Sequence, residues 1–292
     1  MVKWLQLLVT GITMGSVYSL IALGYVTIYK TSRIVNLAQG AFVMFGALLT
    51  YSFLSELGFP YWLAAILSMV AVVILSLVMY LLVLRPLLKI SLVSIILATI
   101  GLSILFENLA LIKWGGYGKS IPYFTGNEVI KVGGVAVARQ SLWVIGLMVL
   151  MLVGLYLLMN HTRIGKQMSA TAADPGAASL SGVSTGRMIL LAFAISAAIG
   201  AVGGMAINPI SSTTYQSGGT FALWGFVAAI LGGWGSSAGA VVGGLALGII
   251  QNLALGFVPA GNEEAIAYAI LILFLYFRPT GMLGIPSGEG ER

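Results

Sequence analysis

The chain opens with "MVKWLQLLVTGITMGSVYSLIALG", residues 1–24, and this stretch decides the class of fold. Between Lys3 and Lys30 lie 26 residues without a charge. A transmembrane helix needs about 20 such residues, because a charged side chain at the bilayer centre costs about 3 kcal/mol. The apolar run is too long for a signal peptide and has no small-x-small cleavage site. We therefore expect a retained membrane-spanning helix.

The composition extends this expectation to the whole chain. Apolar residues make up 59% of the 292 residues and charged residues only 8%, against about 25% charged residues in a soluble domain. Further uncharged stretches of 22, 28 and 75 residues follow, at 34–55, 57–84 and 188–262. No segment alternates apolar and polar residues over the length of a barrel strand. The sequence predicts an all-α, polytopic membrane helix bundle, with residues 1–292 forming a single transmembrane domain.

The apolar runs divide into about eight spans and one shorter element. The element at 221–233 is short or broken, since about 13 residues make a helix of only about 20 Å against a hydrocarbon core of about 30 Å. The spans are expected near 5–28, 36–55, 61–84, 92–112, 141–159, 188–208, from about 238, and from about 262.

The distribution of lysine and arginine assigns the loops to two sides of the membrane. With the 160–187 segment in the cytoplasm, nine basic residues fall inside (30, 33, 85, 89, 163, 166, 187, 278 and 292) and five outside (3, 113, 119, 131 and 139). Lys3 argues against this assignment, because a basic N-terminus usually stays in the cytoplasm. The opposite assignment, however, would place all the loops rich in basic residues outside. The loop at 113–140 is then external, and "EVIKVGGVAVAR" within it predicts a small β-hairpin. A disordered connector is the alternative.

The cytoplasmic segment at 165–187 carries helix start and stop signals. Asp174 before Pro175 reads as an N-cap and first helical position, and Gly182 reads as the C-terminal stop. A short helix is expected at 175–181, after another at about 164–172. Helices this short are marginal in water, so we expect them to need a partner, for which Ala177, Ala178 and Ser181 would offer a small flat face. A plain connector is the alternative.

No enzyme chemistry is recognisable. "WGGYGKS" at 114–120 lacks the first glycine of a phosphate-binding loop, because Lys113 stands in its place. His161 is the single histidine and there is no cysteine, so neither a metal site nor an activated nucleophile is expected. The net charge of +6 comes from scattered residues, which indicates loop topology rather than nucleic-acid binding.

The spans instead use glycine and isolated polar groups. Four glycine pairs spaced four residues apart predict close helix packing: 11 and 15, 200 and 204, 239 and 243, 244 and 248. Glu107 is the one acid expected inside a span, either in a transport pathway or in a structural hydrogen bond. "NPISSTTYQSGG" and "LGGWGSSAG" are polar breaks at membrane depth, which are tolerated inside protein or beside a cavity.

These motifs together resemble the permease family of branched-chain amino acid ABC importers. The family pattern of the cytoplasmic segment is matched, apart from Ser169 at the usual arginine, by Gly165, Ala170, Ala172, Asp174, Ala178, Gly182 and Val183. Four further stretches resemble the family in order: "VNLAQGAFVMFGA", "LATIGLSILFEN", "VAAILGGWGSSAGAVVGGLALG" and "FRPTGMLG". Gln39 stands where the family often has histidine. The chain is more similar to the shorter of the family's two permease types.

The resemblance implies a fold like that of type II ABC importer permeases and a subunit without enzymatic activity. Its partners would be the lipid bilayer, a second permease chain, two ATPase subunits that hold ATP and Mg²⁺, and an extracytoplasmic substrate-binding protein. The setting would be the cytoplasmic (inner) membrane of a bacterium or archaeon. The segment at 160–187 would couple to the ATPases. Candidates for the translocation path are Asn36, Gln39, Gly40, Thr99 and Glu107. The alternatives are a self-contained secondary transporter or channel, and an ABC permease for urea or short amides.

Overall fold

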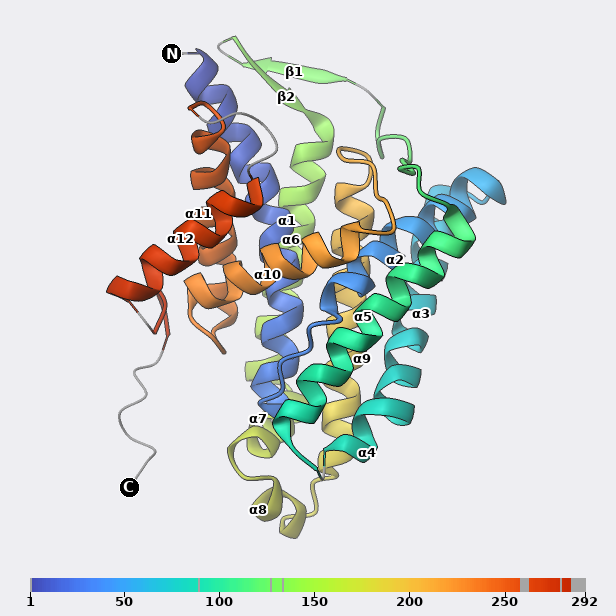
Figure 1. Ribbon diagram of the computed structural model, residues 1–292, viewed down its shortest axis with the longest axis vertical. Coiled ribbons are helices and arrows are strands. Elements are labelled where there is room, and N and C mark those ends of the chain that lie inside the picture. The colour runs from blue at the N-terminus through green and yellow to red at the C-terminus, as the bar shows by residue number, and fades with distance from the viewer. Residues whose placement is uncertain are drawn as a thin grey trace.

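The computed structural model is an almost entirely helical bundle (Figure 1). It describes residues 2–88, 90–126, 128–132, 134–257, 263–278 and 280–284. Lys89 and Arg292, two of the basic residues used for sidedness, lie outside this part of the chain. The described helices are α1 (Val2–Ser32), α2 (Gln39–Tyr51), α3 (Tyr61–Met79), α4 (Arg85–Leu87), α5 (Leu92–Trp114), α6 (Arg139–His161), α7 (Arg163–Ala173), α8 (Pro175–Leu180), α9 (Thr185–Ile207), α10 (Ser217–Gly232), α11 (Ser237–Ala254) and α12 (Glu263–Phe277).

Six helices in the described residues are long and apolar enough to cross a membrane. They are α1, the continuous helix Tyr61–Leu87 that contains α3, α5, α6, α9 and α11. The all-helical membrane bundle is thereby confirmed, with six full-length spans where the sequence predicted about eight. The short element expected at 221–233 is α10, which has 16 residues, or about 24 Å.

The two remaining predicted spans are shorter than expected. The span predicted at 36–55 starts only at Gln39, and its 13-residue α2 continues as a π-helical turn, Ser52–Glu56. Helix formation is interrupted before it because Arg33 has a left-handed φ of 57° and the Asn36 side chain accepts the backbone N–H of Ala38. The last helix, α12, has 15 residues.

Glycines set the contacts between the long helices. Each of the four predicted glycine pairs lies at a helix crossing, which confirms their expected use in packing. Gly11 and Gly15 of α1 face the backbone of α11 at 244–249. Gly200 and Gly204 face α2, where a side chain on Gly204 would overlap the carbonyl oxygen of Val43. The pair at 239 and 243 faces α10, and the pair at 244 and 248 faces α1. As a result α1 lies at the centre, in contact with α6, α9, α10 and α11.

The loop at 113–140 forms the expected hairpin. Strands β1 (Val129–Val132) and β2 (Val135–Ala138) pair antiparallel, with Val129 opposite Ala138. The Gln6 side chain at the start of α1 donates to Ala136 O at 2.8 Å and accepts from Ala136 N at 2.9 Å. Because Gln6 exchanges hydrogen bonds with β2 as a third strand would, the hairpin is anchored to the bundle.

A second anchor holds the first part of the same loop. Buried Asn208, just after α9, accepts from Ile121 N at 2.8 Å and donates to Lys119 O at 3.0 Å. Lys119 also pairs with Thr213 through backbone hydrogen bonds of 2.9 Å in both directions. The loop is therefore tied to the polar break that precedes α10, and the alternative of a disordered connector does not describe it.

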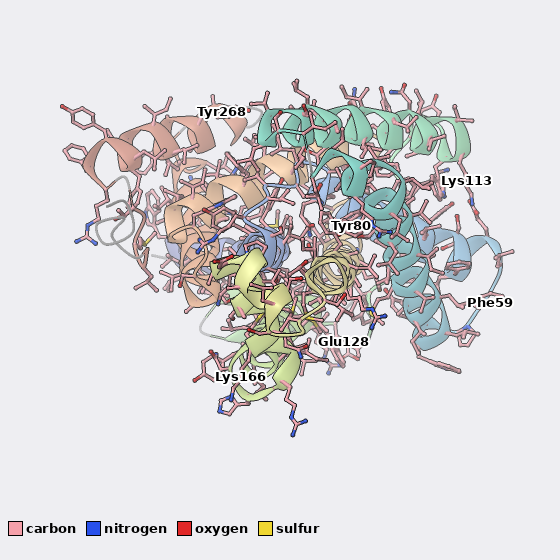
Figure 2. All side chains as sticks on the ribbon, turned by 90° about the horizontal axis from the view of Figure 1, so that it is seen from below. Phe59, Tyr80, Lys113, Glu128, Lys166 and Tyr268 are labelled. Carbon is pink, nitrogen blue, oxygen red and sulfur yellow. The ribbon has the colours of Figure 1, made fainter. Side chains whose placement is uncertain are left out.

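The bundle has two distinct ends. Figure 1 shows the β-hairpin at one end and α7 and α8 at the other, so the two loops that the sequence assigned to opposite sides lie at opposite ends. α5, α10 and α12 are inclined to α1 and α6 in the same view. Figure 2, from below, shows Tyr268 on α12 and Lys113 at the end of α5 along the same side of the molecule, with Lys166 of α7 on the other.

Candidate functional site

The predicted cytoplasmic segment folds into two capped helices. Thr162 caps α7 by accepting the N–H of Gly165 at 3.1 Å. Asp174 caps α8 by accepting the N–H groups of Gly176 at 2.8 Å and Ala177 at 3.0 Å, with Pro175 as the first helical residue. The predicted cap and first helical residue are therefore confirmed.

The end of α8 also agrees with the prediction. Gly182 has a left-handed φ of 82°, and its N–H donates to Ser179 O at 3.0 Å. The N–H of Val183 then donates to Ala178 O at 2.9 Å. These bonds satisfy carbonyl groups that the last helical turn leaves without a partner.

One face of this helix pair docks on the bundle. Gly165, Met168 and Thr171 are buried, and α7 contacts α1, α6 and α9. A side chain on Gly165 would overlap the carbonyl oxygens of Leu158 and Met159 at the end of α6. This glycine lets α7 turn back directly against α6.

The predicted flat face needs one correction. Ala178 is only 6% exposed and turns inward, whereas Ala177 and Ser181 are exposed. Because Val183 folds back and its N–H binds Ala178 O, the side of α8 that carries Ala178 lies against the rest of the chain. Four residues predicted for coupling lie inward or half-buried, namely Gly165, Ala172, Ala178 and Val183.

The outward face carries polar groups and one large apolar side chain. Ser169, Ala170 and Asp174 are exposed. Leu180, at the tip of α8, is 93% exposed, and Ile164 in the first turn of α7 is 44% exposed.

Gln39, one of the five residues proposed for the path, lies at a junction of three helices. Its Nε2 donates to Ser196 O on α9 at 3.2 Å. The hydroxyl of Ser196 lies 2.7 Å from Gln39 Oε1 and 2.8 Å from Gly24 O on α1. The side chain therefore joins α1, α2 and α9, and a side chain on Gly24 would overlap it.

Asn36, Gly40 and Thr99 meet where α2 begins. All three are buried, and the hydroxyl of Thr99 on α5 accepts the N–H of Leu37 at 3.3 Å. A side chain on Gly40 would overlap Gly218 O in the first turn of α10. The Asn36 amide accepts from Ala38 through Oδ1, and its buried Nδ2 has no hydrogen-bond partner in the described part of the chain.

Glu107 lies on α5, eight residues after Thr99. Its Oε1 is 3.2 Å from the Cβ positions of both Gly218 and Gly219, so its carboxylate lies against the first turn of α10. The structure therefore gathers Asn36, Gly40, Thr99 and Glu107 between α2, α5 and α10, while the Gln39 side chain points to α1 and α9.

The sequence did not single out the partners of these residues. The partner of Gln39 is Ser196. Gly40 packs against Gly218, and Glu107 packs against Gly218 and Gly219. The signal for the two glycines was the break "NPISSTTYQSGG", which ends at the first turn of α10. Ser196 is one serine among many in the spans, and no local pattern distinguishes it.

Two of the family-like motifs also meet in space. The backbone N–H groups of Met282 and Leu283, from "FRPTGMLG", donate to Leu231 O at 2.8 Å and Gly232 O at 2.9 Å at the end of α10. Gly281 and Gly233 both have left-handed φ and approach so closely that a side chain on Gly281 would lie 2.5 Å from Gly233 Cα. The C-terminal turn therefore closes the open carbonyls of α10.

Known proteins match this chain along most of its length. Residues 7–275 match the family described as "Branched-chain amino acid transport system / permease component". The high-affinity branched-chain amino acid transport system permease protein LivH of Escherichia coli (strain K12) is 29% identical over 305 residues, covering 98% of this chain and 97% of that protein.

Two further relatives extend this likeness. The high-affinity branched-chain amino acid transport system permease protein BraD of Pseudomonas aeruginosa is 30% identical over 303 residues, covering 98% of this chain and 97% of the relative. A probable branched-chain amino acid transport permease protein LivH of Methanocaldococcus jannaschii is 26% identical over 288 residues, which cover 91% of this chain and 88% of that protein. The chain therefore belongs to the family of branched-chain amino acid transport permease components, and it is a multi-pass membrane permease subunit of an ABC importer.

Proposed function

We propose that this subunit moves branched-chain or other hydrophobic amino acids into the cytoplasm by alternating access. The names of its relatives support this substrate class. The membrane is the cytoplasmic (inner) membrane of a bacterium or archaeon. ATP and Mg²⁺ bind to separate ATPase subunits, and this chain contributes no catalytic residue.

The helix pair α7 and α8 is the coupling element. The observation that carries this assignment is the combination of a docked inner face and an exposed Leu180 at the tip. A force applied at α8 passes through α7 to α1, α6 and α9, because α7 contacts all three. The helix caps at Thr162 and Asp174 keep the pair ordered while it moves.

The two ends of the bundle support the other proposed partners. The external loop at 113–140 receives substrate from an extracytoplasmic binding protein, and its two anchors, at Gln6 and Asn208, support that contact. A second permease chain completes the path, to which Asn36, Gly40, Thr99 and Glu107 contribute from this chain.

Co-purification of the complete importer tests the coupling element. Leu180→Asp should reduce recovery of the ATPase subunits with the permease about tenfold or more, since a charge would be buried in the interface. Leu57→Asp is the matched control, because Leu57 is 60% exposed and lies just before α3 begins, at the opposite end of the bundle from α8. Equal recovery from the wild type and the Leu180→Asp variant would contradict the docking role of α8.

Uptake measurements test the substrate class. The complete importer in proteoliposomes, with ATP supplied to the ATPases, should take up labelled leucine, and excess isoleucine or valine should compete. Competition by urea or acetamide instead would move the assignment to amides. Gradient-driven flux through the purified permease alone, without ATPase subunits, would contradict an ABC mechanism.

A further inference from the structure

The first turn of α10 lies only partly inside the helix bundle, because Gly218 is buried whereas Gln216 and Gly219 are exposed. α10 spans about 24 Å, less than a hydrocarbon core of about 30 Å, and its Gly218 is buried against Gly40 of α2. The first N–H groups of any helix lack a partner within that helix, and in a membrane such groups must be satisfied by protein. The N-cap residue Gln216 makes no side-chain cap hydrogen bond.

A neighbouring helix supplies the missing acceptor. The carboxylate of Glu107, on α5, lies against the backbone of Gly218 and Gly219 in the first turn of α10. A negative charge is stabilised at a helix N-terminus by the N–H groups and the helix dipole. Both Gly218 and Gly219 lack side chains where the carboxylate approaches, since Oε1 lies 3.2 Å from either Cβ position.

Glu107 stands out among the residues of the long helices. It is the only acidic residue in the six spans of the described chain. Other contacts of α5 are made with α2 and the residues beside it. The hydroxyl of Thr99 accepts from Leu37 N. Phe106 packs edge-to-face on Phe45, and Trp114 donates to the hydroxyl of Ser52 at 2.7 Å. Those contacts tie α5 to α2 and its flanking residues, whereas Glu107 ties α5 to α10.

We propose that Glu107 is a positioning residue of the transport cycle that fixes the N-terminus of α10 to α5. The link is non-covalent and forms between two helices inclined to the rest of the bundle (Figure 1), so it can break and re-form when they move relative to each other. Transport needs the link itself, and a helix cap supplied from within α10 does not replace it. The structural part of this inference is independent of the substrate, while its transport part rests on the proposed function.

Distance measurements between α5 and α10 test the link directly. The chain contains no cysteine, so spin labels can be attached to single cysteines introduced at Ile112 and Gln216, both of which are exposed. Glu107→Gln keeps the size of the side chain and removes its charge, and it should broaden the distance distribution between the labels. Asn108→Ala is the matched control, because Asn108 is exposed and its Nδ2 donates to Ile104 O within α5. Equal distributions in the wild type and the Glu107→Gln variant would overturn the inference.

A rescue experiment separates the link from simple helix capping. Ser217→Asp places a carboxylate in the first turn of α10 itself, at a residue whose side chain faces Thr214. In the Glu107→Gln background it should restore the thermal midpoint of the complete importer, while uptake stays at least about fivefold below that of the wild type. Restored uptake in the double variant would show that capping alone is required. Since the label distances do not depend on any substrate, a wrong substrate class would leave them unchanged.

Discussion

The N-cap of α8 allows a prediction with a defined magnitude. Asp174→Ala removes the acceptor of two hydrogen bonds, from Gly176 N at 2.8 Å and Ala177 N at 3.0 Å. Replacing an N-cap aspartate by alanine costs about 1–2 kcal/mol, and 1.4 kcal/mol is about a tenfold change in an equilibrium constant. This loss favours local unfolding of α8 rather than global unfolding, because α8 has only six residues and all but one of them are exposed.

Amide hydrogen exchange of the permease in lipid nanodiscs measures this opening. Protection of the amides at 177–181 should fall about tenfold in Asp174→Ala, since protection follows the free energy of local opening. Asp174→Asn is the matched control: asparagine caps as well as aspartate and loses only the interaction of the charge with the helix dipole, a fall of about two- to fivefold. Unchanged protection in the alanine variant, or equal loss in both variants, would refute the capping argument.

Three further predictions concern packing and anchoring. Gly204→Leu should lower the thermal midpoint by about 5–10 °C, because the new side chain overlaps Val43 O. Gly281→Val should also lower it, since the residue has a φ of 80° and contacts Gly233 Cα. Asn208→Ala should cost about 1–3 kcal/mol and expose the amides at 119–121 to hydrogen exchange, because buried donors lose their acceptor.

Each of these variants has a control in the same chain. Gly146→Leu adds the same side chain in a span where nothing lies within 4 Å of the Cβ position. Gly58→Val shares a left-handed φ, of 70°, but has no neighbour within 4 Å. Asn160→Ala removes an exposed amide that donates only to Tyr156 O of its own helix. Equal effects in variant and control would show that the assigned contact contributes nothing.

Much of the local structure could be predicted because its causes are local. The cap at Asp174, the stop at Gly182 and the hairpin at 129–138 each depend on residues within one turn or one strand pair. The glycine pairs predicted helix crossings, because glycines four apart make one smooth helix face. The pattern did not say which helix would pack against that face.

The number of full-length spans depended on backbone conformation and on contacts between distant residues, which the composition does not indicate. Residues 34–38 are as free of charge as the helices beside them, yet α2 starts only at Gln39. The interruption comes from the left-handed backbone at Arg33 and the Asn36 turn, which are stable because Thr99 of α5 supplies an acceptor for Leu37 N. A contact with a residue 62 positions away leaves no periodic signal.

By itself the sequence determined that this chain lies in a membrane as a helical bundle, that the loops at 113–140 and 160–187 lie at opposite ends of it, and where the short helices α7 and α8 begin and end. Those properties follow from hydrophobicity, charge and capping, which act along the chain. Only the tertiary structure decided that Ala178 turns inward, that Gln39 joins three helices, and that Glu107 on α5 meets the first turn of α10. The physical reason is that these are pairings between distant segments. Their energies depend on distance and direction in space, which spacing in the sequence does not encode.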